Sequence, residues 1–174
     1  MTYLLILLFY STWITQINSR QCYPPEWPYI GDYGCIHVAT AYEPDPRICE
    51  RATGKDPVWR NQDHYNEIIE FMKRNNVKHS WLGLKFVGQD IMVTGSENAV
   101  CPTEKVPWLP GEPSLEDAEG NDICLEIREN NGELGVGTIQ CGVTKDYAKD
   151  KWGNTYTLCQ LDGFDRNNPA EVCQ

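Results

Sequence analysis

Periodic apolar positions between residues 65 and 87 predict a helix followed by a strand. Four apolar side chains follow the i, i+3, i+4, i+7 spacing of one helix face: Tyr65, Ile68, Ile69 and Met72. Lys73 and Arg74 come next and suit the C-terminal end of the helix dipole. Alternation over residues 81–87 would place Leu82, Leu84 and Phe86 on one side of a strand.

The remaining patterns predict an α+β domain. Asp45 and Pro46 are typical of a helix start, as N-cap and first-turn proline, and Gly54 would end this short helix after Cys49. Short runs predict further strands over residues 91–94, 124–128, 137–141 and 155–161. Two helices followed by several short strands indicate an α+β domain with an antiparallel sheet.

Residues 94–124 show neither helical nor strand periodicity. This stretch contains several glycines and the prolines Pro102, Pro107, Pro110 and Pro113. A loop this long inside a compact domain is unusual unless it is functional or disordered. Trp108 and Cys101 favour an ordered loop with Trp108 as its anchor, because disorder would call for neither a tryptophan nor a disulfide.

The N-terminal residues are typical of a secretory signal. An apolar run over residues 4–10 continues with polar interruptions to Ile17, and Ser19 is the small residue that signal peptidase requires before Arg20. The run is too short and too interrupted to span a membrane. We therefore expect a signal peptide at residues 1–19 and a secreted mature chain without membrane insertion; an uncleaved anchor or a buried N-terminal strand is the alternative.

Eight cysteines follow this segment, and their even number in an oxidising compartment predicts four disulfides. A zinc site would need a pair such as Cys-x-x-Cys, and none occurs. The histidines His37, His64 and His79 are dispersed and do not show the spacing of metal ligands. We expect them to be surface or hydrogen-bonded residues.

Charge and residue types exclude several classes of function. The formal net charge of −10 argues against nucleic acid as a partner, since a phosphate-binding surface needs clustered lysine and arginine. No Ser/His/Asp or Cys/His set is discernible, and every cysteine is expected in a disulfide. We therefore do not expect an enzyme. Nothing in the sequence indicates the oligomeric state.

Several motifs, in order, resemble those of the long-form C-type lectin-like domain. They are Cys22-x4-Trp27-x7-Cys35, Trp81-Leu-Gly-Leu84, Glu112-Pro113-Ser114, Asp122-Ile-Cys124-Leu-Glu-Ile127, Cys141 and Cys159. The resemblance implies two helices packed on antiparallel sheets, a long loop region, and a domain over residues 20–161 with a tail at 162–174. Trp27, Trp81 and Leu82 are then expected in the core.

The resemblance also implies a disulfide pairing. In the family's pattern Cys22 pairs with Cys35, Cys49 with Cys159, and Cys124 with Cys141, which leaves Cys101 and Cys173 to tie the tail to the long loop. A rival assignment closes the fold at Cys173, with Cys141–Cys159 and Cys101–Cys124. It is disfavoured because Cys124 lies 12 residues after Glu112, near the family spacing, and Cys141 lies 29 after it.

In sugar-binding members of this family the motif around a cis-proline chelates calcium and a sugar. The corresponding positions here are Glu112, Ser114, Asp122, Gly137 and Thr138, of which only Glu112 and Asp122 keep a strong calcium ligand. We therefore expect calcium to bind weakly, if at all. The alternative is that both carboxylates are solvated loop acids. Neighbouring acids could supply further oxygens: Glu116, Asp117, Glu119 and Glu133.

Three function classes follow from the resemblance. The first is a secreted lectin that binds glycans with weakened or absent calcium dependence. The second is a calcium-independent module that binds a protein ligand through the long-loop face. The third is an extracellular matrix component. The missing amide and carboxylate at positions 137 and 138 favour the second class, and the retained Glu112 and Asp122 favour the first.

Overall fold

The computed structural model describes residues 28, 30, 33–40, 49, 54–96, 98–115, 122–141, 156–162 and 165–174. The expected signal at residues 1–19 lies outside these ranges. So does most of the short helix expected over residues 45–54, of which the structure describes Cys49, in a helical conformation, and Gly54.

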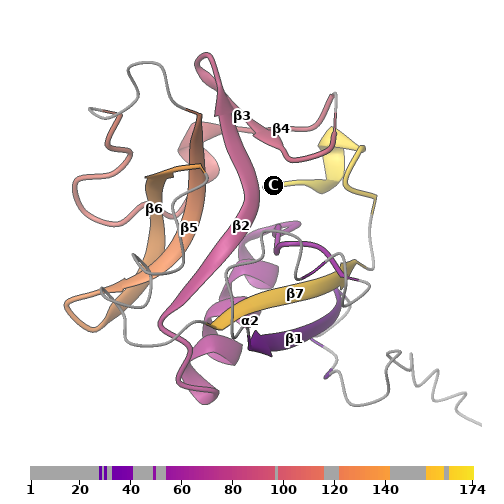
Figure 1. The fold of residues 1–174 in the computed structure, drawn as a ribbon. Helices are drawn as coiled ribbons and strands as arrows, with labels where there is room; N and C mark the ends of the chain where they lie inside the picture. The colour runs from indigo at the N-terminus through magenta and orange to yellow at the C-terminus, as the bar shows by residue number, and fades with distance from the viewer. Residues whose placement is uncertain are drawn as a thin grey trace, which may run out of the picture.

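The described strands form two antiparallel sheets (Figure 1). The smaller sheet pairs β1 (Gly34–Thr40) with β7 (Tyr156–Asp162). The larger has the order β4-β3-β2-β5-β6. Its strands are β2 (His79–Val87), β3 (Asp90–Val93), β4 (Val100–Cys101), β5 (Ile123–Asn130) and β6 (Glu133–Gln140). The α+β class with antiparallel sheets is thus confirmed, whereas β1 and β4 were not expected.

One α-helix, α2 (Gln62–Arg74), lies within the described residues. Its start is capped by Asn61, whose side chain accepts a hydrogen bond from the amide of His64 at 3.0 Å. The predicted apolar face is buried, and Phe71 adds to it. Lys73 and Arg74 end the helix as expected. Two short 3-10 turns, η1 (Thr103–Lys105) and η2 (Pro169–Glu171), lie later in the chain.

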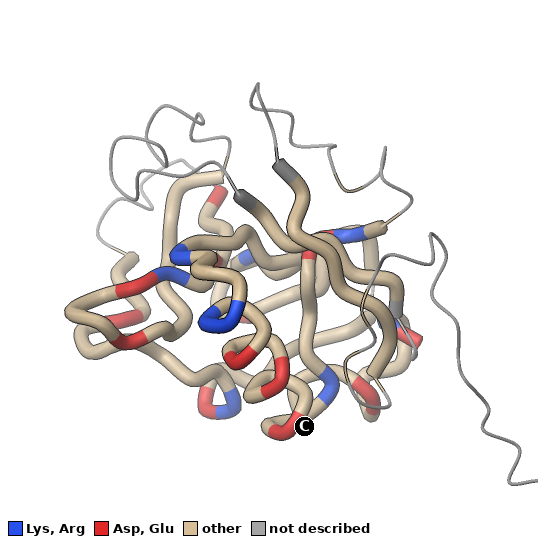
Figure 2. The backbone as a smooth tube through the Cα atoms, turned by 90° about the horizontal axis from the view of Figure 1, so that it is seen from below, with Lys and Arg blue, Asp and Glu red and all other residues tan. Residues whose placement is uncertain are grey.

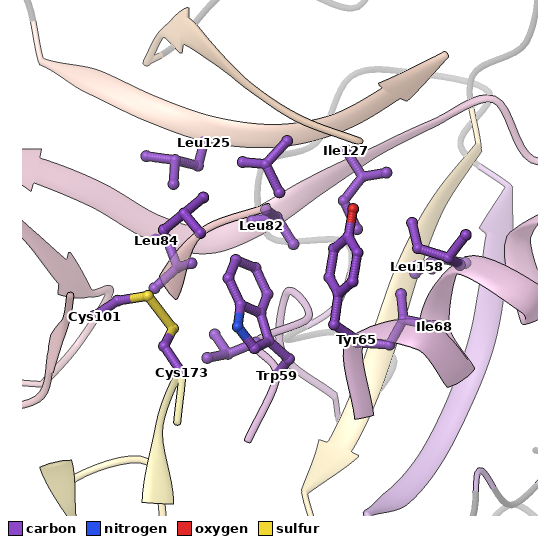
Figure 3. Packing of buried hydrophobic residues seen from close by; sticks show 14 of the residues in the cluster. Trp59, Tyr65, Ile68, Leu82, Leu84, Cys101, Leu125, Ile127, Leu158 and Cys173 are labelled. Atoms are coloured by element: carbon purple, nitrogen blue, oxygen red, sulfur yellow. A yellow bond between two sulfur atoms is a disulfide. The ribbon is translucent and has the colours of Figure 1, made fainter. Parts of the chain in front are cut away.

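The core lies between α2 and one face of the five-stranded sheet (Figure 3). Trp59 is its largest fully buried side chain, and its ring meets that of Tyr65 edge to face at 5.4 Å between centroids. The sheet contributes Leu82, Leu84, Leu125, Ile127 and Val136. Trp59 was not predicted, because it stands in a segment without periodicity.

Trp81 does not belong to this core. It is half-buried and pairs in register with Glu126, so it lies on the opposite face of the sheet from Leu82. The expectation of a core tryptophan at position 81 was therefore wrong, since strand alternation separates Trp81 from Leu82. Trp27, the other tryptophan expected in the core, lies outside the described residues.

Three disulfides agree with the expected pairing: Cys49–Cys159, Cys101–Cys173 and Cys124–Cys141. The rival pairing is therefore wrong. Cys35 is also disulfide-bonded, and its expected partner, Cys22, lies outside the described residues. The tail is built into the core, because Val172 and Cys173 are fully buried and the amide of Cys173 donates to the carbonyl of Trp59 at 3.0 Å.

Three disulfides within the described part of one chain are typical of proteins that fold in an oxidising, extracellular compartment. Within the described part of the chain, no helix has the length and apolar character needed to cross a membrane. Both findings are compatible with a secreted protein.

Replacing Cys101 and Cys173 together by alanine should lower the free energy of unfolding by about 2–4 kcal/mol. The reason is that this bridge restricts 72 residues of the unfolded chain. Denaturant unfolding followed by tryptophan fluorescence measures the loss. The Cys124–Cys141 bridge closes only 17 residues, so its removal should cost less. If the variant with alanine at positions 101 and 173 were as stable as the wild type, this account would be contradicted.

His64 should make stability depend on pH below neutrality. It is buried, and burial together with the charges of Arg166 and Arg60 lowers its pKa from 6.5 to about 3. Its stabilising contribution is therefore complete above the unfolded pKa of 6.5 and is lost as the pH falls towards 3.

Between pH 6 and 4 the His64→Asn variant should show a slope of unfolding free energy about 1.4 kcal/mol per pH unit smaller than the wild type. Asparagine can keep the hydrogen bond that the amide of Arg60 donates to Nδ1 of His64 at 3.0 Å, but it does not titrate. Denaturation at several pH values measures the slope. Equal slopes would show that His64 is not held neutral.

Candidate functional site

The loop of residues 102–115 runs along the outer edge of β6. Val136 donates its amide to the carbonyl of Pro107 at 3.1 Å and accepts the amide of Leu109 at 2.8 Å. Two residues further along the same edge, the amide of Thr138 donates to the Glu112 carboxylate at 3.0 Å. The loop therefore satisfies the backbone groups of an edge strand that would otherwise be open to another chain.

The carboxylate of Glu112 is enclosed by this chain's own donors. Its Oε2 accepts the Thr138 hydroxyl at 2.5 Å and the Ser114 amide at 2.9 Å, in addition to the Thr138 amide. Its Oε1 pairs with Nη2 of Arg128. The Glu112–Pro113 bond is cis, as in the motif that it resembles, and the Glu112 side chain is only 7% exposed.

Arg128 brings a positive charge to this loop from β5. Its Nη1 donates to Oε1 of Glu126 at 2.7 Å and to the carbonyl oxygen of Thr138 at 3.3 Å, while Nη2 donates to Glu112. The guanidinium thus lies among oxygens from the loop, β5 and β6. Charge-assisted hydrogen bonds of this kind are stronger than neutral ones.

Glu126 continues the network into the sheet. It is fully buried, and its Oε2 lies 2.8 Å from Nε2 of His79 on β2. Glu126 and Arg128 are two residues apart on β5, so they share the sheet face opposite to Leu125 and Ile127. A continuous chain of polar groups therefore runs from β2 through β5 to the long loop.

Gly137 provides the space for the guanidinium. A Cβ atom at this position would lie 2.3 Å from Nη1 and 2.5 Å from Cζ of Arg128. Gly137 pairs in register with Glu126, so it faces the same side of the sheet as the network. Any larger residue at position 137 would need Arg128 to move.

The same contacts set the charge states at the loop. Burial alone would raise the pKa of Glu112, but the Thr138 hydroxyl, the amides of Ser114 and Thr138 and the charge of Arg128 hold this pKa below its ordinary value. Burial alone would lower the pKa of Arg128, and its bonds to Glu126 and Glu112 raise it instead. Both groups are therefore charged at neutral pH.

The structure brings together most of the predicted site residues. Glu112, Ser114 and Thr138 are in direct hydrogen-bond contact, and Gly137 lies against the arginine that binds Glu112. Asp122 lies just before β5 with an exposed side chain, and its carbonyl accepts the amide of Cys141 at 2.7 Å, which extends the pairing of β5 with β6 and is not a contact with this group.

Of the further acids considered as oxygen donors, only one lies within the described residues. Residues 116, 117 and 119 lie outside the described ranges, and Glu133 is exposed at the start of β6.

These residues do not fit a calcium ion. Calcium needs six to eight oxygens, several of them carboxylate. Here Oε1 of Glu112 is paired with Arg128 and Oε2 accepts three hydrogen bonds. Across the described residues, no three or more His, Cys, Asp or Glu side chains form a group that could hold a metal ion.

Arg128 and Glu126 were missed by the sequence reasoning. Both lie in the run over residues 124–128 that predicted a strand, and alternation places them on one face. The available signal was a glycine opposite each charged residue, Gly137 opposite Glu126 and Gly135 opposite Arg128. It could be interpreted only with the register of β5 and β6 known.

Trp108 anchors the start of the loop, as predicted. Its Nε1 donates to the carbonyl of Thr103 at 3.0 Å, and its ring stacks on Phe86 of β2 at 6.4 Å between centroids. The indole is half-buried, so part of it remains accessible beside the loop.

Comparison with known proteins adds no identification. No protein-family model matches the chain, and no curated protein matches it in sequence.

Removing the Thr138 hydroxyl should weaken the loop and raise the pKa of Glu112. Thr138→Val keeps the shape but loses the hydrogen bond that the hydroxyl donates to the Glu112 carboxylate, at a cost of about 1.5–3 kcal/mol. Glu112 stabilises the fold above its unfolded pKa, and this contribution is lost as the pH falls through the lower folded pKa. Stability should therefore depend less steeply on pH in the acid range in the variant than in the wild type.

Carboxyl NMR titration and acid unfolding measure both effects. The exposed Thr103, in the same loop, supplies the matched control Thr103→Val. An unchanged pKa of Glu112 in Thr138→Val would show that the hydroxyl does not hold the carboxylate.

Proposed function

We propose that this protein is a secreted C-type lectin-like domain that binds a protein ligand through its long-loop face without calcium. The order of the motifs supports the family. The cis Glu112–Pro113 bond, the three disulfides and the α+β architecture are compatible with it. The disulfides and the expected signal peptide support secretion.

The observation that carries calcium independence is the enclosure of Glu112. A sugar held by a metal in this family needs that carboxylate as a metal ligand, and here Arg128, Ser114 and Thr138 already bind both of its oxygens. The loop is therefore held in place without an added ion. A ligand that meets this face would meet a preformed protein surface, which favours contacts of the protein–protein kind.

The surface charge favours a ligand that is not a polyanion. The chain carries a net charge of −10, and Figure 2 shows Asp and Glu positions interspersed with Lys and Arg over the described backbone. Close to the loop motif, Leu115 is 44% exposed and offers an apolar contact. A protein partner whose binding surface is basic or neutral fits the negative net charge and the exposed leucine.

A second candidate function is calcium-independent carbohydrate binding. It is favoured by the stacked pair Phe86 and Trp108, because the accessible part of a partly buried indole can pack against the apolar side of a sugar ring. The Nε1 of Trp108 is already bonded to Thr103, so the ring is fixed in position.

Binding of the labelled protein to cell surfaces and matrix preparations should be unchanged when calcium is replaced by a chelator. Protease treatment of the target should abolish this binding and glycosidase treatment should not, because the proposed ligand is a protein. Glu112→Gln should weaken binding by loosening the loop. Glu67→Gln, an exposed acid on α2 outside the loop, is the control and should have no effect.

Loss of binding on chelation would overturn the proposal. Binding that survives protease and is lost after glycosidase treatment would instead support the carbohydrate-binding candidate.

A further inference from the structure

We propose that Arg128 takes the structural place of a bound cation in the long loop. Its guanidinium holds Glu112 to the sheet, and the missing side chain at Gly137 leaves the space that the guanidinium occupies. This inference deepens the proposed function, on which it rests, by naming the residue that makes the loop independent of an added ion. Arg128 is a positioning residue, since it acts on the loop through Glu112.

The surroundings of the guanidinium are those of a bound cation. It contacts oxygens of Glu112, Glu126 and Thr138, which come from the loop, β5 and β6. Two of these oxygens belong to carboxylates, so one positive group links two negative groups that would otherwise repel each other. The planar fork of arginine can bind both at once, which a point charge cannot do as well.

Burial makes this arrangement different from an ordinary surface ion pair. The side chains of Arg128, Glu112 and Glu126 are 17%, 7% and 1% exposed. Removing one partner of a buried pair leaves an uncompensated charge, which is strongly destabilising, whereas exposed pairs contribute little. The pair Lys78–Glu129, which joins the residue before β2 to β5, is 41% and 35% exposed and provides the comparison.

The far side of the network keeps Arg128 from moving. Glu126 is held by His79 at 2.8 Å, and the ring of His79 packs edge to face on Trp81 at 5.0 Å between centroids. The guanidinium is thus directed at Glu112 by residues of the rigid sheet. The orientation of the loop follows from the sheet.

Gly137 and Arg128 are coupled by sterics. The space beside the glycine is filled by Nη1 and Cζ, at 2.3 and 2.5 Å from where a Cβ would stand. A methyl group there would push the guanidinium away from Glu126 and from the Thr138 carbonyl. The substitution Gly137→Ala should therefore act through Arg128.

The test is a double-mutant cycle on the full chain. It compares Arg128→Met, Glu112→Gln and the variant that carries both substitutions. We expect Arg128→Met to lower the Tm by roughly 6–12 °C and to speed hydrogen exchange of the Thr138 and Ser114 amides by about 10-fold or more. The combined variant should be no less stable than Arg128→Met alone, because Glu112→Gln removes the charge left unpaired. In the wild type, both amides should stay protected when a chelator is added.

The control cycle uses Lys78→Met and Glu129→Gln, whose effects should be small and additive because both groups are half-exposed. Gly137→Ala should speed exchange at Thr138 in the wild type and add nothing to Arg128→Met. If Arg128→Met does not fold, Arg128→Lys replaces it and should give intermediate protection, since it keeps the charge without the fork.

Additive effects of Arg128→Met and Glu112→Gln would overturn the inference. So would wild-type protection in Arg128→Lys, or loss of wild-type protection on chelation. These readouts concern folding alone, so they are separate from ligand binding. A protein whose loop passes this test but whose ligand binding needs calcium would refute the proposed function and leave the role of Arg128 intact.

Discussion

The charge of Glu112 has to be balanced inside the protein before the long loop can close on β6. A carboxylate that is only 7% exposed loses most of its hydration, and burial would favour its neutral form. The Thr138 hydroxyl, two backbone amides and Arg128 offset this cost, so the carboxylate stays charged and accepts the edge amide of Thr138. The contact of the loop with the Thr138 end of β6 and the position of Ser114 depend on that balance.

The covalent frame allows such a loop to be long. Cys101 fixes the beginning of the loop region to the tail through Cys173, and Cys124 fixes its end to Cys141. Both bridges lie next to strands of the large sheet, so the loop between them is held at two points. Trp108 adds an anchor through Phe86 and Thr103. The order of this region thus comes from fixed ends and a few polar contacts.

The same arrangement explains why the proposed function does not involve a metal. Gly137 stands at the position where the motif that this sequence resembles would offer an amide, and its empty side-chain space is filled by Arg128. A loop that is preorganised by its own arginine pays no cost of ordering when it meets a ligand. Such a surface suits recognition of a partner whose contacts are spread over the loop face.

The sequence by itself determined the elements whose signals are local. The spacing of Tyr65, Ile68, Ile69 and Met72 predicted α2, and alternation predicted β2, because burial of one face imposes these periods. Short runs predicted β3, β5 and part of β6. Motif order suggested the disulfide pairing and singled out Glu112, Ser114 and Thr138, which the structure brings together. β1 and β4 were not foreseen: β4 is only two residues long, and β1 depends on pairing with β7, which lies far along the chain.

Only the tertiary structure decided what the site contains. Trp81 and Leu82 are neighbours in the chain, yet register places one beside Glu126 and the other in the core. Glu112 and Arg128 are separated by 16 residues, and their pairing depends on how the loop returns along β6. Opposite charges attract over any sequence separation, so their partners are set by the folded geometry and cannot be derived from the order of residues.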